Sequence, residues 1–367
     1  MGGSSTVGEK AVGRRSSTVI GSLRSGILSG KYAVGAFLPS VRQLAGDIGL
    51  APETARRALK ALEAQGLVAA RPGSGYQVLA RANDPGAGCP VAFLDWRPEG
   101  SASSRDFNAQ LLAELKLAAG ARGWPLLVLS SGSLSLRETL DRLTAARACG
   151  VLLSDPDAGL LAAVREAQLP AVLLDDWEEA AGTDSVMQDG HQGGVLAAEH
   201  LVAAGCRRIA WFGPTDGNSH TLARLGGFSS RLLSLGRELP TALCWAAGSD
   251  DALDSRASSL LSGADRPDGI AALWQGHTVA LKRAADGLGL VPGRDFRMVG
   301  WCPEESYGSQ HLPLFAPGPA APAVTWSVRT MALTALARLA ERRENPSLPA
   351  LSVKVPVRLR GTEALRH

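Results

Sequence analysis

LPSVRQLAGDIGLAPETARRALKALEAQGLVAARPGSGYQV, residues 38–78, decides the fold of the N-terminal part of the chain. Its first apolar residues recur at helical spacing and share one face: Val41, Leu44, Ala45 and Ile48. Ser40 is a suitable N-cap for this helix, and Gly49 can take the left-handed conformation that ends it. The pattern therefore predicts a short amphipathic helix followed by a tight turn.

A second helix is predicted to begin at Pro52, because the first helical turn does not use the N–H that proline lacks. Its apolar residues face inward: Ala55, Ala58, Leu59 and Leu62. Its polar and basic residues are left outward: Glu53, Thr54, Arg56, Arg57 and Lys60. After Gly66, the runs LVAA and YQVL are typical of two short strands around the turn RPGSG. This order of elements predicts a winged helix-turn-helix, whose second helix meets DNA.

Positive charge is concentrated in this segment. Residues 14–81 contain ten Lys and Arg against three Asp and Glu, whereas residues 82–367 contain 27 basic and 31 acidic residues. The net charge of +3 therefore combines a basic head with a mildly acidic body. A local excess of positive charge is typical of a DNA-binding module, since displaced phosphate counterions drive binding. A merely solvated helix face is the alternative, but here the basic residues coincide with the second helix and the hairpin.

The remaining composition is that of a globular, cytoplasmic protein, with 45% hydrophobic residues. No apolar run reaches membrane-spanning length, and the N-terminal MGGSSTVGEKAVGRRSS lacks the apolar core of a secretory signal. The five cysteines are scattered without CxxC pairs, and the six histidines show no HxxxH spacing. We therefore expect no disulfide framework, no metal and no cofactor.

Four regions are expected along the chain: a disordered N-terminus at residues 1–15, a winged helix-turn-helix at 16–80, a linker at 81–89 and a two-lobed domain at 90–367. A further helix is expected at residues 19–27. In the last region, apolar strand-like runs such as VAFLDW, residues 91–96, alternate with amphipathic helices, and the alternation starts over near residue 190. Such alternation predicts the α/β class, with βαβ units and parallel sheets buried on both faces.

The head resembles the GntR family of bacterial transcription regulators. The resemblance is carried by LPSxRxLA, a turn, a TxR-containing helix and a Gly-x-Gly wing, matched by Leu38, Pro39, Ser40, Arg42, Leu44, Ala45, Thr54, Arg56 and Gly73 to Gly75. Together with the outward-facing Arg57, it implies these DNA contacts: Arg42, Thr54, Arg56, Arg57, Gly73, Ser74 and Gly75. Pro52 stands where many such heads carry a base-reading arginine, so the resemblance does not transfer an operator sequence.

The body is similar to the effector domain of the lactose/galactose-repressor family, and through it to periplasmic sugar-binding proteins. The resemblance is carried by DSVMQDGHQGGVLAAEHLVAAGCRRIAWFG at residues 184–213, ARLGGF at 223–228 and VPGRDFRMVGW at 291–301. It implies a two-lobed, periplasmic-binding-protein-like Rossmannoid domain. The combination with a GntR-like head resembles the arabinose-repressor type of architecture.

The same resemblance implies that Asp175 and Arg224 bind sugar hydroxyls between the two lobes, through paired hydrogen bonds. A strand-end cap and a surface ion pair are their alternatives. Trp274 and Gln275 replace the family's Asn-Asp pair, Cys302 stands where a ligand carboxylate is usual, and Trp326 stands where a glutamine is common. Gln188 falls at a position that often holds an aromatic residue. These positions are the expected ligand contacts: Asp175, Gln188, Arg224, Trp274, Gln275, Cys302 and Trp326. The tryptophans favour stacking against a ring, with core packing as their alternative.

These features predict a cytoplasmic, sequence-specific transcription regulator. We expect it to repress by binding operator DNA as a homodimer, under control of a small sugar-like ligand held between the lobes. In the alternative, the body only dimerises and binds no effector. An enzyme is not expected, because the chain has no GxSxG elbow and no Walker loop. An aminotransferase-like body, which some GntR-headed proteins carry, would be longer and richer in lysine than this body, whose only lysines are Lys116, Lys282 and Lys354.

Overall fold

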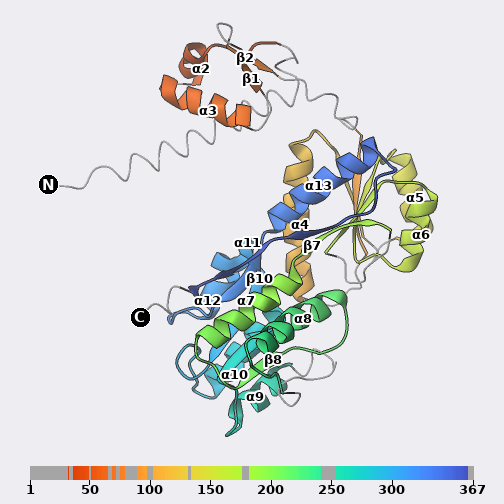
Figure 1. Cartoon of the computed structure of the whole chain (residues 1–367). Helices are drawn as coiled ribbons and strands as arrows, with labels where there is room; N and C mark the ends of the chain where they lie inside the picture. Colours follow the sequence, from red (N-terminus) through yellow and green to blue (C-terminus); the bar gives the residue numbers. More distant parts are fainter. Residues whose placement is uncertain are drawn as a thin grey trace, which may run out of the picture. The chain divides into compact units, whose positions relative to one another are not determined.

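The computed structural model describes residues 32, 36–48, 51–64, 68–71, 75–78, 89–96, 102–130, 134–175, 182–240 and 253–362. The expected disordered N-terminus at 1–15, the expected helix at 19–27 and all of the expected linker at 81–89 except Cys89 lie outside these residues. The four expected domain boundaries therefore stay predictions. The head and the body are each described by themselves (Figure 1).

The head begins with helix α2 (Val41–Ile48), followed by α3 (Pro52–Ala64) and the strands β1 (Val68–Arg71) and β2 (Gly75–Val78). The Gln43 N–H donates to Ser40 Oγ at 3.3 Å, and the Ser40 N–H donates to Gln43 Oε1 at 2.9 Å, so Ser40 caps α2. The inward faces are confirmed by one buried cluster: Leu38, Leu44, Ala45, Ala55, Ala58, Leu59, Leu62, Val68 and Val78.

The wing is a hairpin extended by the segment that precedes α2. Strands β1 and β2 pair antiparallel, with Val68 opposite Val78. The Leu38 N–H donates to the Tyr76 carbonyl at 2.8 Å, and the Val78 N–H donates to the Ala36 carbonyl at 2.8 Å. The segment before the first helix thus ties the wing to the helix-turn-helix, and all three parts of the head share one core.

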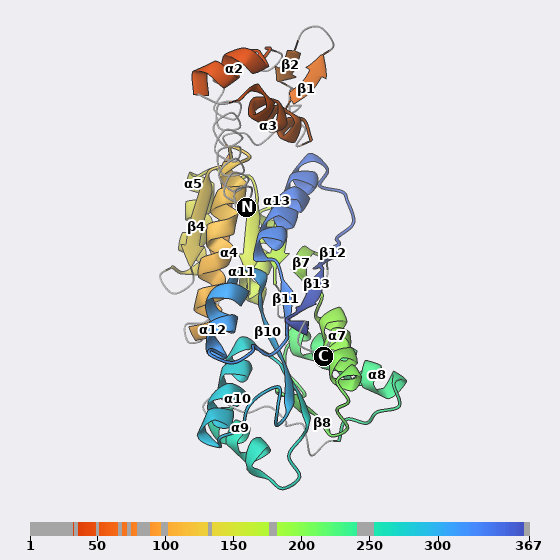
Figure 2. The same ribbon diagram turned by 90° about the vertical axis from the view of Figure 1, so that its left-hand side faces the viewer.

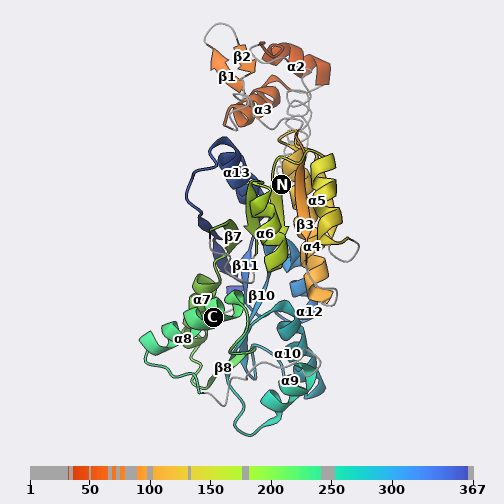
Figure 3. The same ribbon diagram turned by 90° about the vertical axis from the view of Figure 1, so that its right-hand side faces the viewer.

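The first lobe of the body is built on a six-stranded sheet in the order β12-β7-β6-β5-β3-β4. Its strands are β3 (Val91–Asp95), β4 (Leu126–Ser130), β5 (Val151–Ser154), β6 (Ala171–Leu174), β7 (Asp184–Gln188) and β12 (Ser352–Val355). Its helices are α4 (Ala102–Gly120), α5 (Leu136–Ala145), α6 (Ala158–Glu166) and α13 (Val328–Glu344). Figure 1 shows α4 and α13 on one face of this sheet and α5 and α6 on the other, and in Figure 3 the side that carries α5 and α6 is turned toward the viewer.

The second lobe has a five-stranded sheet in the order β13-β11-β10-β9-β8. Its strands are β8 (Ile209–Phe212), β9 (Gly269–Ala272), β10 (Arg297–Pro303), β11 (Ala323–Trp326) and β13 (Val357–Arg360), of which β13 is antiparallel to β11. Its helices are α7 (Gly190–Ala203), α8 (Ser219–Ser234), α9 (Leu253–Ser262), α10 (Gln275–Gly287), α11 (Glu304–Ser306), the π-helix η4 (Tyr307–His311) and α12 (Leu312–Leu314). Helices α7 and α8 lie on one side of this sheet and α9 and α10 on the other (Figure 2).

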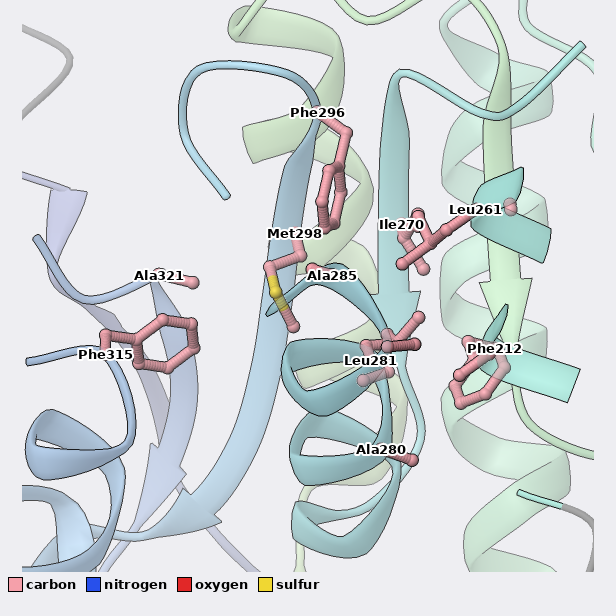
Figure 4. Close-up of a cluster of buried hydrophobic side chains, with 14 residues drawn as sticks. Phe212, Leu261, Ile270, Ala280, Leu281, Ala285, Phe296, Met298, Phe315 and Ala321 are labelled. Carbon is pink, nitrogen blue, oxygen red and sulfur yellow. The ribbon is translucent and has the colours of Figure 1, made fainter. Parts of the chain in front are cut away.

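The side of the second sheet that faces α9 and α10 is a compact apolar core. Phe212, Ile270 and Met298 come from three neighbouring strands, and Leu261 and Leu281 come from the helices that cover them (Figure 4). Strands β8 and β9 are buried at every residue, without alternation of buried and exposed positions, as expected for a sheet covered on both sides. The predicted α/β class with parallel sheets is thereby confirmed.

The described chain passes between the lobes at three places, and each passage is a single residue. Asp189 joins β7 to α7, Ser327 joins β11 to α13, and Pro356 joins β12 to β13. Asp189 and Ser327 are helix N-caps whose side chains accept hydrogen bonds from Gln192 N and Thr330 N. The carboxyl ends of the parallel strands in both lobes therefore face the region where the lobes meet, which is where ligands bind in open α/β sheets.

In the part of the chain that the structure describes, no helix is long and apolar enough to cross a membrane. In the same residues, no group of three or more His, Cys, Asp or Glu side chains is arranged to hold a metal ion.

Candidate functional site

The outward face of α3 is basic and exposed. Arg56 and Arg57 both project into solvent and both pair loosely with Glu53, at 3.8 Å and 4.0 Å. Exposed pairs of this kind contribute little free energy, so the guanidinium groups can exchange Glu53 for phosphate at small cost. Arg42 on α2 is also exposed, and Thr54 in the first turn of α3 is half-buried. The structure therefore confirms the predicted outward face of α3.

The wing contributes one described residue to the expected DNA contacts. Gly75 begins β2 with a φ of 103°, and a Cβ built there would meet nothing within 4 Å. Its constraint is therefore conformational, because L side chains rarely adopt this φ. Next to it, Arg71 Nε donates to Gln77 Oε1 at 2.9 Å across the hairpin. Gly73 and Ser74 lie outside the described residues.

In the first lobe of the body, Asp175 and Gln188 come together at the carboxyl ends of two neighbouring strands. Asp175 directly follows β6 and has a φ of 48°, and Gln188 is the last residue of β7. Gln188 Nε2 donates to Asp175 Oδ1 at 3.1 Å. Both side chains are buried. The left-handed backbone of Asp175, which is uncommon for a residue other than glycine, is a sign of a constrained functional position.

Helix α8 of the second lobe supplies the matching side chains. Arg224 Nη2 donates to Gln188 Oε1 at 2.6 Å, and Arg224 Nη1 donates to the Leu273 carbonyl at 2.6 Å. One turn earlier on the same helix, His220 Nε2 lies 3.5 Å from Asp175 Oδ1. The charges of Arg224 and Asp175 are therefore linked through the Gln188 amide and not by direct contact.

Two tryptophans enclose the guanidinium group of Arg224. Its Cζ lies 3.8 Å from the ring centroid of Trp274 and 3.9 Å from that of Trp301, and the side chain is fully buried. Trp301 Nε1 also donates to Gln188 Oε1 at 2.8 Å. These distances are those of stacked guanidinium and indole planes, a favourable cation–π geometry. We call these six residues the interlobe cluster: Asp175, Gln188, His220, Arg224, Trp274 and Trp301.

Burial sets the protonation of this cluster. The pKa of His220 is lowered by burial, although the Asp175 charge beside it acts in the opposite direction. Burial also lowers the pKa of Arg224, again opposed by Asp175. The nearby His277 has its pKa lowered to about 4 by burial and by the Arg224 charge. Near neutral pH the imidazoles of His220 and His277 are therefore neutral.

Glycines allow α7 and α8 to pack closely enough to place Arg224. A Cβ at Gly194 would lie 2.1 Å from the Arg224 carbonyl oxygen, and a Cβ at Gly227 would lie 2.0 Å from the His191 carbonyl oxygen. A Cβ at Gly193 would lie 2.1 Å from Trp301 Cη2. The contact between the two helices thus explains Gly194 and Gly227, and the contact with Trp301 explains Gly193.

The other predicted ligand residues lie around this cluster. Trp326 ends β11 with its ring centroid 6.3 Å from that of Trp301, and its buried Nε1 has no hydrogen-bond partner among the described residues. Gln275 opens α10, next to Trp274. Cys302 lies in a small apolar cluster with Tyr307 and Ala323, where burial raises the pKa of its thiol to about 12. The ligand role of all seven residues stays a prediction.

The sequence interpretation did not assign two members of the cluster as site residues. His220 precedes Arg224 by four residues, a spacing that puts both on one face of a helix. Trp301 ends the motif VPGRDFRMVGW, which carried the family resemblance but assigned this residue no contact. The spacing could have indicated His220, whereas the contact between Trp301 and Gln188 joins residues 113 positions apart and leaves no local pattern.

The comparisons with known proteins agree with this architecture. Residues 15–78 match the family "Bacterial regulatory proteins, gntR family". Residues 101–262 match "Periplasmic binding proteins and sugar binding domain of LacI family", and residues 198–362 match "Periplasmic binding protein-like domain". These matches cover the head and most of the body.

Individual relatives are similar over parts of the chain. The maltose regulon regulatory protein MalI of Escherichia coli (strain K12) is 30% identical over 143 residues, which span 36% of this chain and 40% of that protein. A structure of the transcriptional regulator CelR with cellobiose is 19% identical, with a TM-score of 0.61 over 88% of this chain and 98% of that chain. The Lac repressor dimer bound to operator and the anti-inducer ONPF is 19% identical, with a TM-score of 0.59 over 76% of this chain and 93% of that chain. The chain therefore has an N-terminal segment that matches the gntR family model, followed by a body that matches periplasmic-binding-protein models, including that of the LacI family.

Proposed function

We propose that this protein is a bacterial, sequence-specific DNA-binding transcription regulator that represses from an operator. The single observation that carries the proposal is the exposed basic face of α3, presented by a compact winged-helix core. Arg56 and Arg57 offer guanidinium groups whose present partner, Glu53, is exchangeable. Such groups bind phosphates and the edges of guanine in the major groove.

The head acts in pairs. A single winged helix makes few base contacts, so two heads joined through their bodies gain affinity from the high effective concentration of the second head. The assembly proposed is a homodimer on two related half-sites. The relatives are regulators and not enzymes, and we assign no catalytic activity to this chain. Its place of action is the cytoplasm, where the DNA is.

The body senses a small ligand between the two lobes. The residues proposed to contact it are those predicted from the sequence: Asp175, Gln188, Arg224, Trp274, Gln275, Cys302 and Trp326. A sugar or sugar derivative is the proposed class, supported by the relatives that regulate maltose genes or bind cellobiose. A ligand that prefers one arrangement of the lobes would shift the population toward it, and with it the spacing of the heads.

One observation favours a second candidate function, in which the body only dimerises the heads and binds no effector. Arg224 already lies against two indoles and has both terminal nitrogens hydrogen-bonded, with only its Nε left without a hydrogen-bond partner among the described residues. Asp175 is likewise bonded to Gln188. A sugar could use the Nη groups of Arg224 only by displacing the carbonyl of Leu273 and the amide of Gln188.

The experiment that tests the proposal is selection of operator sequences from random duplexes with the full-length protein, followed by fluorescence anisotropy on the selected duplex. We expect a selected, partly palindromic sequence and tight binding that falls steeply with salt. Arg56→Ala should reduce that binding, whereas Arg283→Ala, which removes an exposed arginine of the body, should not. Failure to select any sequence, or equal binding by Arg56→Ala, would contradict the proposal. Sugars added to the preformed protein–operator complex separate the two candidate functions of the body. Release of the operator supports effector binding, and unchanged binding supports a body that only dimerises.

A further inference from the structure

We propose that Arg224, held between Trp274 and Trp301 of its own lobe, latches the two lobes together through its hydrogen bond to Gln188 of the first lobe, so that the body closes without a small molecule. The inference deepens the regulatory role proposed above and rests on it, because lobe closure matters to function only if the heads respond to it. The closing element is then a side chain of this chain.

The first support is the close approach of two indoles to the Arg224 guanidinium group, whose Nε has no hydrogen-bond partner among the described residues. The separations of 3.8 Å and 3.9 Å from Cζ to the two ring centroids are those of direct stacking. No second ring can enter between the guanidinium and either indole without moving one of them, because such a ring needs about 3.5 Å of its own on each side. We call Arg224 with Trp274 and Trp301 the sandwich. It occupies the indole surface on which a ring-shaped ligand would stack.

The second support is that the hydrogen bonds of this sandwich cross from one lobe to the other. Arg224 and Trp301 belong to the second lobe, yet both donate to Gln188 Oε1 of the first lobe, at 2.6 Å and 2.8 Å. The side-chain oxygen of Gln188 on β7 thus accepts hydrogen bonds from two elements of the opposite lobe. His220 adds a further contact to Asp175 of the first lobe at 3.5 Å. Opening the lobes would leave a buried guanidinium and a buried indole N–H without these acceptors, which is costly.

The third support is a separate set of contacts between the lobes, formed by α11. Ser306 Oγ donates to Gln110 Oε1 on α4 at 3.1 Å. Glu305 accepts from Ser327 Oγ at 2.9 Å and from the N–H groups of Val328 and Arg329 at 3.1 Å and 3.0 Å, at the start of α13. Besides the three chain passages, two sets of side-chain contacts therefore join the described lobes, one around Arg224 and the other at α11.

The chemistry of the residue types explains why arginine can play this part. A guanidinium group is planar and weakly hydrated, so it stacks on aromatic faces and tolerates burial better than an ammonium group. The indole faces supply negative electrostatic potential, and Gln188 connects the group to the Asp175 carboxylate. Trp274, Trp301 and Arg224 thus act together.

The test measures the distance between the lobes in the full-length protein. Spin labels are attached to Glu166→Cys on α6 and Asp265→Cys after α9, both exposed positions, in a background where Cys89, Cys149 and Cys244 are replaced by serine. Cys206 and Cys302 are kept, because burial raises the pKa of their thiols to about 11 and about 12 and slows labelling. For the otherwise unchanged chain, with no added ligand, we expect one narrow distance population that matches the present lobe arrangement.

Two variants then remove the latch in different ways. Arg224→Lys keeps the charge but loses the planar stacking and the paired donors, and Trp274→Leu removes one indole from a half-buried position. We expect a broader population at longer distance in both. Arg231→Lys, on the same helix in a half-exposed ion pair with Glu199, is the matched control and should leave the distance unchanged.

A folded Trp274→Leu protein whose label distance equals that of the unchanged chain would overturn the proposal, even if Arg224→Lys fails to fold. A long distance in the ligand-free chain that shortens only when cellobiose or ribose is added would also overturn it. Neither result depends on operator binding, so failure of the latch and failure of the DNA-binding proposal can be told apart. Restoration of the short distance in Trp274→Phe, which returns an aromatic face, would support it further.

Discussion

The head and the body place their functional side chains in opposite environments. In the head, the arginines of α3 project into solvent, and their only described ion pairs are the loose ones with Glu53. In the body, Arg224 is fully buried, lies against two indoles and is hydrogen-bonded at both terminal nitrogens, while its Nε has no hydrogen-bond partner among the described residues. The same residue type is therefore available to a partner in one region and already engaged in the other.

This difference indicates which substitutions of charged residues each region should tolerate. An exposed arginine can be removed from the head without disturbing its core, so the loss should appear in binding alone. A buried charge in the body is part of the packing, and its loss should appear in folding or in lobe arrangement. The predictions below are designed to break or sharpen this contrast.

The largest effect is expected at Asp184, the buried first residue of β7. Its carboxylate accepts from Arg338 at 3.0 Å, from Arg342 at 2.8 Å and from the Leu351 N–H at 2.8 Å. Asp184→Asn removes the charge partner of Arg342 and one of the two charge partners of Arg338, and we expect about 3–5 kcal/mol less stability in denaturant unfolding. Asp254→Asn, which breaks an exposed pair with Arg283, is the control and should change stability by less than ~0.5 kcal/mol. Equal effects in the two variants would remove the contrast.

The same carboxylate predicts a pH dependence. Burial by itself would raise the pKa of Asp184, but its hydrogen bonds to Arg342, Leu351 and Arg338 outweigh this and lower it below the ordinary 3.8. Because the pKa is depressed in the folded state, the stabilisation is complete above the unfolded value and is lost as the pH falls through 3.8 and below. Unfolding curves at pH 7, 5, 4 and 3 should show the difference between the unchanged chain and Asp184→Asn shrinking toward the lowest pH. A constant difference would contradict the assignment.

A smaller loss is expected where α7 meets α8. Gly227→Ala would put a Cβ 2.0 Å from the His191 carbonyl oxygen, and we expect a loss of about 3 kcal/mol as the helices separate. The adjacent Gly226 has nothing within 4 Å of its Cβ position, so Gly226→Ala should be neutral or stabilise the helix by up to ~1 kcal/mol. Thermal unfolding of the pair tests this directly. Similar melting temperatures would show that the helix contact is not tight.

In the head, Arg57→Ala should weaken binding to the selected operator by about 1–3 kcal/mol while leaving the melting temperature unchanged. Its side chain is 68% exposed and its pair with Glu53 is long, so nothing in the fold depends on it. The slope of affinity against salt should also decrease if the contact is to phosphate. A destabilised Arg57→Ala protein would show that the exposed face of α3 has a structural role.

The smallest effect is expected at the start of α2. Ser40→Ala removes the side-chain acceptor for the Gln43 N–H and should cost about 1 kcal/mol of head stability. Ser40→Asp restores an acceptor and should recover most of that loss. Hydrogen exchange of the α2 amides, followed separately from those of the body, measures both. No difference between the alanine and aspartate variants would mean that the cap does not contribute.

Most of the head could be predicted from the sequence, because its information is local. The helix start at Pro52, the cap at Ser40 and the buried faces of both helices follow from spacings of three and four residues, and all are confirmed. The α/β class of the body followed equally from the alternation of apolar runs and amphipathic helices. Strand β7, at residues 184–188, was treated as part of a motif and not as a strand, because its sequence DSVMQ carries polar residues in a fully buried position.

The site in the body could be predicted only in part. Asp175, Gln188, Arg224 and Trp274 were indicated by resemblance, and the structure brings them into one cluster. That the cluster members bond to one another, through Gln188 and with Trp301, could not be read from spacing, because these contacts depend on how two separate sheets face each other. Polar residues in a motif predict a site, but not whether the site is already filled by the chain.

The three one-residue passages between the lobes determine how the body can move. Pro356 has its φ fixed by its ring, and Asp189 and Ser327 are fixed by their capping hydrogen bonds. The Asp189 N–H also donates to the Val355 carbonyl at 2.9 Å, which ties two of the passages together. Three short, rigid connections restrict large hinge motions of the lobes and favour a small rotation about one axis. A lobe on such an axis behaves as a lever, so a change of a few degrees at the joints becomes a displacement that grows with distance from them.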